Sequence, residues 1–259
     1  MDILEVFGAQ IPIILLLLVR TGAIVFSAPV FGSPNIPPTL KVATTVFIVL
    51  ALLPLIQPPE LNIATSMLLY GLYVVRESLI GFVIGFATSL LMNSFFIAGQ
   101  AVDTQMGLGV MNVIDPLSKV HIPIVGQIEF LIAVMIFLSV NGPYHTIRAL
   151  LWSYEVLPIS ELNLPRFGSG ILRMSADMWL IAVKIAAPVM AAVLLTHVGL
   201  GMVAKTVPQM NVFLVGFALT ISVGLITVYA SLTWFRPLTE ELFNSLFEQV
   251  GFLLKAGAA

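Results

Sequence analysis

Ionisable side chains stand inside or beside strongly apolar runs at several points of this chain. They are Arg20, Arg76, Glu77, Asp103, Glu129, Lys184, His197 and Lys205. A charged group that faces lipid alone is strongly penalised, so each of these groups must face protein or water. One interpretation makes them parts of a proton or ion pathway. The other makes them interhelical pairs, or contacts to partner subunits, that fix the register of the helices.

Spacing favours the structural interpretation. Glu129 and Lys184 are one acid and one base, so we expect each to lie near an opposite charge or a polar group, and they would satisfy each other if their helices met. Arg76 and Glu77 are adjacent, which places them about 100° apart on a helix and predicts separate partners. His197 has no second histidine at ligand spacing and is interpreted as a core histidine.

A Gly-rich polar stretch, residues 99–116, interrupts the apolar sequence. It holds two carboxylates, two Gln, one Asn, three Gly and a Pro. Irregular backbone at membrane depth is tolerated only where it is packed inside protein or lines an aqueous path. We therefore expect a loop over residues 99–122, and the loop indicates a conduit or gate.

Signatures of catalysis and cofactor binding are missing from the sequence. It contains no His-Glu-x-x-His, no Walker loop and no G-x-G-x-x-G after a strand. The absence of cysteine excludes disulfides and thiolate metal sites. An enzyme would have to depend on Asp103 and Asp115 as an acid pair across a Gly-rich loop. We expect no enzyme, no cofactor and no metal.

Composition places the chain among integral membrane proteins. Hydrophobic residues make up 59%, charged residues only 9%, and the mean hydropathy is +1.07, whereas about a quarter of the residues of soluble domains are charged. The net charge of −2 is too small to indicate a nucleic-acid partner.

Six apolar segments, separated by Pro, Gly and Asn, predict an all-α membrane domain. They cover residues 11–31, 42–55, 61–98, 122–140, 178–203 and 212–232. A polar stretch, 158–173, divides the chain, and residues 239–255 have the spacing of an amphipathic helix.

Two lengths do not fit ordinary membrane spans. Residues 41–53 would make a helix of roughly 20 Å, shorter than the hydrocarbon core of ~30 Å, whereas 61–98 would make one of roughly 57 Å. These lengths favour hairpins packed against other chains over six conventional, tilted spans. The spacing of Gly81 and Gly85, and of Gly216, Thr220 and Gly224, indicates close helix packing.

The stretch Ala-Gly-Gln-Ala-Val-Asp-Thr-Gln-Met-Gly-Leu-Gly at residues 98–109, closing at Asp115-Pro116, resembles the signature of the FliR family of flagellar type III export-gate membrane proteins. The resemblance extends to Ser27-Ala-Pro-Val, to Asn141-Gly142 and to residues 208–224. It also includes the total length and the order of segments. The related virulence type III secretion branch, SctT, shares the fold, so it remains an alternative.

The resemblance implies a gate subunit. Residues 1–157, with loop 99–122, would be a FliP-like part, and residues 158–259 a FliQ-like hairpin with its tail, within one domain. The chain would assemble with FliP and FliQ homologues, and with FlhB and FlhA homologues, in the bacterial inner membrane at the flagellar basal body. Unfolded flagellar proteins would be the substrate, and lipid would surround the assembly. A secondary transporter, with Glu129, Lys184 and His197 at a midplane site, is the other alternative.

The resemblance also places a pore plug in the loop, at about residues 106–122. Gly allows tight backbone folding there, and apolar side chains are suited to dewetting a constriction. The plug or gate residues are Gln105, Met106, Gly107, Leu108, Gly109, Val110, Met111, Asn112, Val113, Ile114, Asp115 and Pro116. An ordinary buried connector is the alternative.

Overall fold

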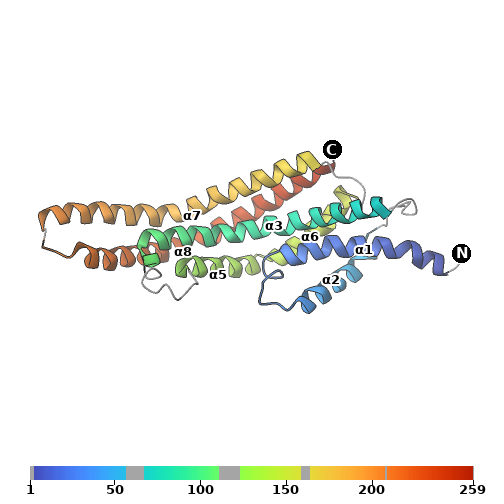
Figure 1. The fold of residues 1–259 in the computed structure, drawn as a ribbon, viewed down its shortest axis with the longest axis horizontal. Helices are drawn as coiled ribbons and strands as arrows, with labels where there is room; N and C mark the ends of the chain where they lie inside the picture. The colour runs from blue at the N-terminus through green and yellow to red at the C-terminus, as the bar shows by residue number, and fades with distance from the viewer. Residues whose placement is uncertain (1–2, 57–66, 111–122, 159–163, 208, 259) are drawn as a thin grey trace. The chain divides into compact units, whose positions relative to one another are not determined.

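The structure, a computed structural model, describes residues 3–56, 67–110, 123–158, 164–207 and 209–258, and these residues form helices and no strand (Figure 1). The elements are α1 (Ile3–Ser27), α2 (Pro38–Leu52), α3 (Met67–Met106), the 3-10 helix η2 (Leu108–Val110), α5 (Ile124–Ser139), α6 (Gly142–Val156), α7 (Leu164–Thr206) and α8 (Val212–Ala258). The predicted fold class, an all-α integral membrane protein, is confirmed.

Three helices are long and apolar enough to cross a membrane within the described residues. They cover Met67–Met106, Gly168–Thr206 and Val212–Lys255, with mean hydropathies of 1.9, 2.2 and 2.2. The pair α5 and α6 passes the same test when it is taken together as one broken span. The break lies at Asn141, whose φ of 57° is in the left-handed region that asparagine tolerates better than most residues.

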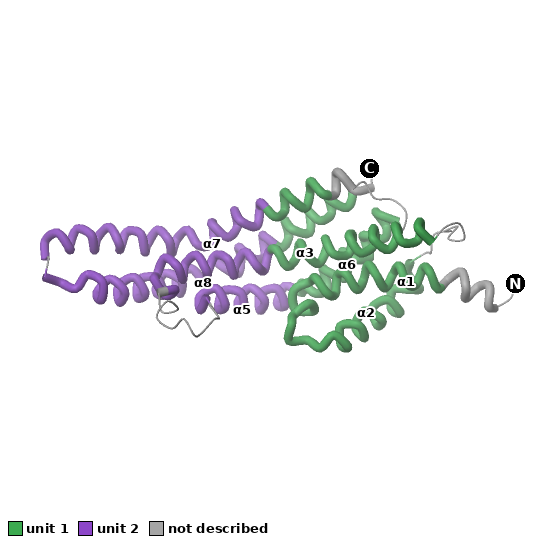
Figure 2. The backbone as a smooth tube through the Cα atoms, viewed as in Figure 1, with its two compact units in different colours: residues 1–90, 141–175, 243–259 green, residues 91–140, 176–242 purple. Residues whose placement is uncertain are grey.

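The chain divides into two compact units, which are coloured separately in Figure 2. Unit 1 comprises residues 1–90, 141–175 and 243–259, and unit 2 comprises residues 91–140 and 176–242. The helices α3, α7 and α8 each contribute to both units. Each unit draws on both sides of the predicted boundary at residue 158, and the division into a FliP-like and a FliQ-like part stays a prediction.

Unit 1 packs α1 directly against the N-terminal part of α3. A Cβ atom at Gly81 would lie 2.2 Å from the carbonyl oxygen of Arg20, and one at Gly85 would lie 2.1 Å from Oγ of Ser27. Only glycine permits this approach of two backbones. The close packing predicted from the spacing of these two glycines is therefore present.

Unit 2 has two similar close contacts. A Cβ atom at Gly99 of α3 would lie 2.4 Å from Cα of Gly126 of α5, and one at Gly224 of α8 would lie 2.6 Å from the Met106 side chain. Phe95 of α3 packs edge-to-face on Phe235 of α8, with 5.8 Å between ring centroids. These contacts join α3, α5 and α8 inside the unit.

Several predicted boundaries are wrong. The expected loop 99–122 begins too early, because α3 continues as a helix to Met106. Gly99 and Asp103, which were expected in this loop, lie in α3 and contact α5. The expectation of about six segments omitted α6, an amphipathic helix whose polar side chains lower its hydropathy. The tail is a continuation of α8, and α7 begins at Leu164 inside the expected polar stretch.

Candidate functional site

Arg20 of α1 is the centre of a buried polar network in unit 1. Its side chain is 0% exposed, and its Nε and Nη2 atoms donate to the two carboxylate oxygens of Glu77 at 2.6 and 2.9 Å. Nη1 donates to the carbonyl oxygen of Ser153 at 3.0 Å, and Nη2 donates to that of Leu157, also at 3.0 Å. The guanidinium also lies 4.2 Å from the ring centroid of Tyr154. One cation therefore joins α1, α3 and the C-terminal end of α6.

This network has a structural role, because it holds three helices together. A bidentate arginine–carboxylate pair is the geometry in which a buried ion pair is best compensated. Nε, Nη1 and Nη2 of Arg20 all donate to groups of this chain. Glu77 is buried against Arg20, whereas Arg76 is half-buried. That the two adjacent residues have separate partners stays a prediction.

Asp103, near the C-terminal end of α3, caps the N-terminus of α5 in unit 2. The backbone N–H of Val125 donates to both carboxylate oxygens, at 3.2 and 3.0 Å, and that of Gly126 donates to Oδ2 at 3.3 Å. The first N–H groups of a helix lack partners within it, and the positive end of the helix dipole favours a carboxylate. Asp103 is only 2% exposed and satisfies these groups from another helix.

Glu129 follows Val125 by one helical turn and is 1% exposed. Its Oε2 has no hydrogen-bond partner among the described residues. The expected pairing with Lys184 is wrong, because Lys184 is exposed on α7 and lines a cavity that contains neither Glu129 nor His197. His197 is exposed and not the core histidine that was expected.

The C-terminal end of α3 is fixed by α8. Met106 is 0% exposed, and its carbonyl oxygen accepts a hydrogen bond from Oγ1 of Thr220 at 3.1 Å. Gly107 follows with φ +85°, the left-handed conformation that commonly ends a helix. A Cβ atom there would also lie 2.6 Å from the ring of Phe217. The Met-Gly pair of the predicted plug is therefore a helix end that α8 holds in place.

The remaining plug residues differ in what the structure describes. Gln105 belongs to α3, Leu108 and Gly109 are half-buried, and the backbone of Val110 completes η2. Met111, Asn112, Val113, Ile114, Asp115 and Pro116 lie outside the described residues. The described part thus establishes where this segment starts and how it is attached, and the plug assignment itself stays a prediction.

No group of three or more His, Asp or Glu side chains in the described ranges has the arrangement of a metal site. Three of the buried polar side chains instead bind other parts of the fold: Arg20 joins three helices, Asp103 caps α5, and Thr220 caps α3. The sequence favoured structural roles for Arg20 and Asp103 and helix packing for Thr220, but it did not identify their partners, because each partner lies at least 22 positions away.

Fold and site together define a multi-pass, all-α membrane protein whose buried polar groups fasten helices to one another. The chain belongs to the family of bacterial export proteins described as family 1, whose sequence profile matches residues 11–246. The predicted resemblance to FliR is confirmed by several relatives.

Three of these relatives are named flagellar biosynthetic protein FliR. The one from Bacillus subtilis (strain 168) is 30% identical over 249 residues, which cover 94% of this chain and 95% of that protein. The one from Escherichia coli (strain K12) is 27% identical, with 89% and 88% covered. The one from Aquifex aeolicus (strain VF5) is 28% identical, with 92% of each chain covered.

Proposed function

We propose that the chain is a structural, non-catalytic subunit of the flagellar type III protein export gate in the bacterial inner membrane. It helps to form and close the pore through which unfolded flagellar proteins leave the cytoplasm. Family membership supports the flagellar assignment, since the relatives that cover nearly the whole chain are named flagellar biosynthetic proteins.

The observation that carries the gate assignment is the attachment of the predicted plug at both of its ends. Before it, Thr220 caps the last turn of α3 and Phe217 packs on Gly107. After it, Asp103 binds the first N–H groups of α5. A segment that closes a pore must be held firmly where it leaves its scaffold, because otherwise it could not return to one sealed position.

The surfaces of α7 and α8 support assembly with partner chains. In their most apolar windows only 28% and 17% of the residues are buried within this chain, against 67% for α3. Lys184 is exposed within the apolar part of α7, where lipid would penalise its charge. A polar or acidic group on a neighbouring subunit would satisfy it, so we propose FliP and FliQ homologues as direct partners, with FlhA and FlhB homologues nearby.

The division of the chain belongs to the same proposal: residues 1–157 take a FliP-like position and residues 158–259 a FliQ-like position. The transporter alternative is not favoured, because Lys184 and His197 are exposed while Glu129 is buried. The virulence alternative is not favoured either, because the relatives carry flagellar names.

Co-purification tests this proposal. The full chain, tagged and co-expressed with the FliP and FliQ homologues of its own source, should be isolated in a discrete complex of fixed stoichiometry. Expressed without them, it should be degraded or heterogeneous in detergent. Lys184→Glu should reduce the yield of the complex, whereas the matched substitution Lys205→Glu, near the end of α7, should reduce it less. A monodisperse, protease-resistant chain obtained alone would contradict the proposal.

A further inference from the structure

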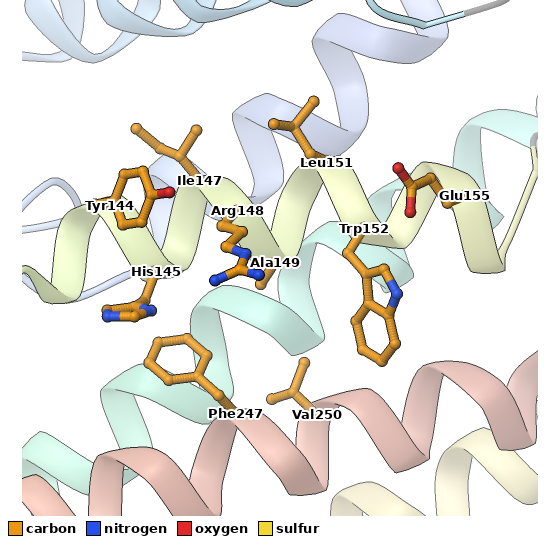
Figure 3. A pocket seen from close by; sticks show the side chains of 10 residues that line it. All are labelled: Tyr144, His145, Ile147, Arg148, Ala149, Leu151, Trp152, Glu155, Phe247 and Val250. Carbon is orange, nitrogen blue, oxygen red and sulfur yellow. The ribbon is translucent and has the colours of Figure 1, made fainter.

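A cavity of about 630 Å³ opens between α6 and the C-terminal part of α8, within unit 1 (Figure 3). Its volume is in the range of small-ligand sites, about 300–1,000 Å³. The residues that carry the argument are His145, Arg148, Trp152 and Glu155 of α6, with Phe247 and Val250 of α8. None of them belongs to the Arg20 network or to the ends of the predicted plug.

One face of α6 presents these four side chains in a fixed order. The positions 145, 148, 152 and 155 follow the helical repeat, so an imidazole, a cation, an indole and an anion stand in one row. Arg148 and Glu155 are both exposed, and neither has a hydrogen bond or ion pair with another residue in the part of the chain that the structure describes. Figure 3 shows Arg148 between His145 and Trp152, directed toward α8.

The aromatic side chains around Arg148 are held by packing. The ring of His145 lies 5.3 Å from that of Phe247, centroid to centroid. The indole of Trp152 stands against Gly251, where a Cβ atom would come within 2.6 Å of the ring, and Nζ of Lys255 lies 5.6 Å from the ring centroid. Tryptophan and tyrosine rings beside charged groups are typical of the level of lipid headgroups in a bilayer.

We propose that this cavity binds the headgroup of a zwitterionic phospholipid of the phosphoethanolamine class. The phosphate oxygens accept hydrogen bonds from the Arg148 guanidinium, whose planar set of donors matches a phosphate. The primary ammonium donates to the Glu155 carboxylate, two helical turns along α6. The apolar surfaces of Phe247, Val250 and Trp152 contact the glycerol and the first carbons of the acyl chains.

Charge distinguishes this ligand from other phosphates. Arg148 and Glu155 carry opposite charges along α6, and Nζ of Lys255, beside Trp152, adds a second cation for the phosphate. An anionic lipid without an ammonium would leave the Glu155 carboxylate without a partner, and that carboxylate repels a free phosphate ion. A choline headgroup has no N–H to donate to Glu155. The headgroup that uses both charges is therefore one with a phosphate and a primary ammonium.

Photocrosslinking in native membranes tests the proposal without extraction. Vesicles from cells that make the complete assembly would be loaded with a photoactivatable phosphatidylethanolamine, and labelled peptides would be mapped by mass spectrometry. The peptide containing residues 142–156 should be labelled. Arg148→Gln and Glu155→Gln should each lower that labelling about fivefold, the factor expected for one charged contact at a membrane surface. The matched control Arg173→Gln, an exposed arginine of the same unit outside the cavity, should leave it unchanged.

Competition separates the sources of phosphate. Unlabelled phosphatidylethanolamine should suppress the labelling, whereas phosphatidylglycerol, phosphatidylcholine and millimolar inorganic phosphate should not. Equal labelling in Arg148→Gln, or equal competition by any of the other three, would overturn the proposal. Because Arg148 and Glu155 are exposed, chain levels in the vesicles should not change, and immunoblotting checks this. Failure of the unsubstituted chain to form a complex would contradict the proposed function, whereas an intact complex with unchanged labelling in Arg148→Gln would contradict this inference alone, so the two failures are distinguishable.

Discussion

Arg20 and Glu77, 57 positions apart, form a bidentate ion pair that is almost completely removed from solvent. The pair does not stand alone, because the same guanidinium also donates to two carbonyl oxygens at the C-terminal end of α6. The three helices that meet there therefore depend on one side chain.

We predict that Arg20→Ala or Glu77→Ala destabilises the protein by about 3–5 kcal/mol, because each leaves a buried charge without its partner. The measurement is the thermal stability and yield of the complex after extraction. The control is Arg236→Ala, which breaks an exposed pair with Glu240, side chains 77% and 41% exposed, and should cost at most about 1 kcal/mol.

The double variant Arg20→Met with Glu77→Leu should recover much of the lost stability, since it removes both buried charges together. If Arg20→Ala were as stable as the exposed control, the network would not hold the three helices.

A second prediction concerns the contact of Gly99 with Gly126. Gly99→Ala should lower stability, because its Cβ would lie 2.4 Å from a backbone atom that cannot move aside. The control is Gly71→Ala, at a helical position of α3 with open space, which should be neutral or stabilising by about 0.5–1 kcal/mol. Equal melting temperatures for Gly99→Ala and Gly71→Ala would show that α3 and α5 do not approach as closely as described.

A third prediction concerns the cap that Asp103 provides. Asp103→Ala should loosen the start of α5, because hydrogen bonds to a charged group contribute about 1.5–3 kcal/mol. Hydrogen exchange at the amides of Val125 and Gly126 measures this directly, and both should exchange faster. Asp177→Asn, which removes a carboxylate from α7, should leave these amides unchanged. Unchanged exchange in Asp103→Ala would mean that the cap does not stabilise the helix.

The fourth prediction concerns the plug. Deleting residues 107–112 should make cells that express the whole gate leak ions or small solutes while the complex still assembles. The reason is that the deletion removes apolar side chains proposed to seal the pore. Replacing the same six positions by Gly and Ser keeps the length and should also leak. Ion flux into dye-loaded cells is the measurement. A deleted gate as tight as its parent would identify the segment as a connector.

Patterns within single segments predicted much of the fold. The four-residue spacing of Gly81 and Gly85 predicted close packing, because that spacing puts both on one face of a helix, and α1 lies on that face. The sequence also predicted a helix longer than one membrane span in this region, and α3 is such a helix, with 40 residues.

Contacts between distant segments could not be predicted in the same way. Gly99 and Asp103 have the composition of a loop, yet both lie in α3, where one permits an approach and the other caps a neighbouring helix. The neighbouring sequence does not distinguish a glycine or aspartate that contacts another helix from one that forms a turn. Similarly, α6 was missed because Tyr144, Arg148 and Glu155 dilute its hydropathy, although its helical spacing is regular.

The Arg20 network also imposes an order on synthesis. At about 5–20 residues per second, Glu77 leaves the ribosome about 3–11 s after Arg20, and the carbonyl groups of Ser153 and Leu157 follow about 7–27 s after it. Throughout that interval the nascent chain carries a cation without its final acceptors, which an apolar bilayer penalises. Helix α1 must therefore wait, shielded by water or by the insertion machinery, until the ribosome has passed residue 157.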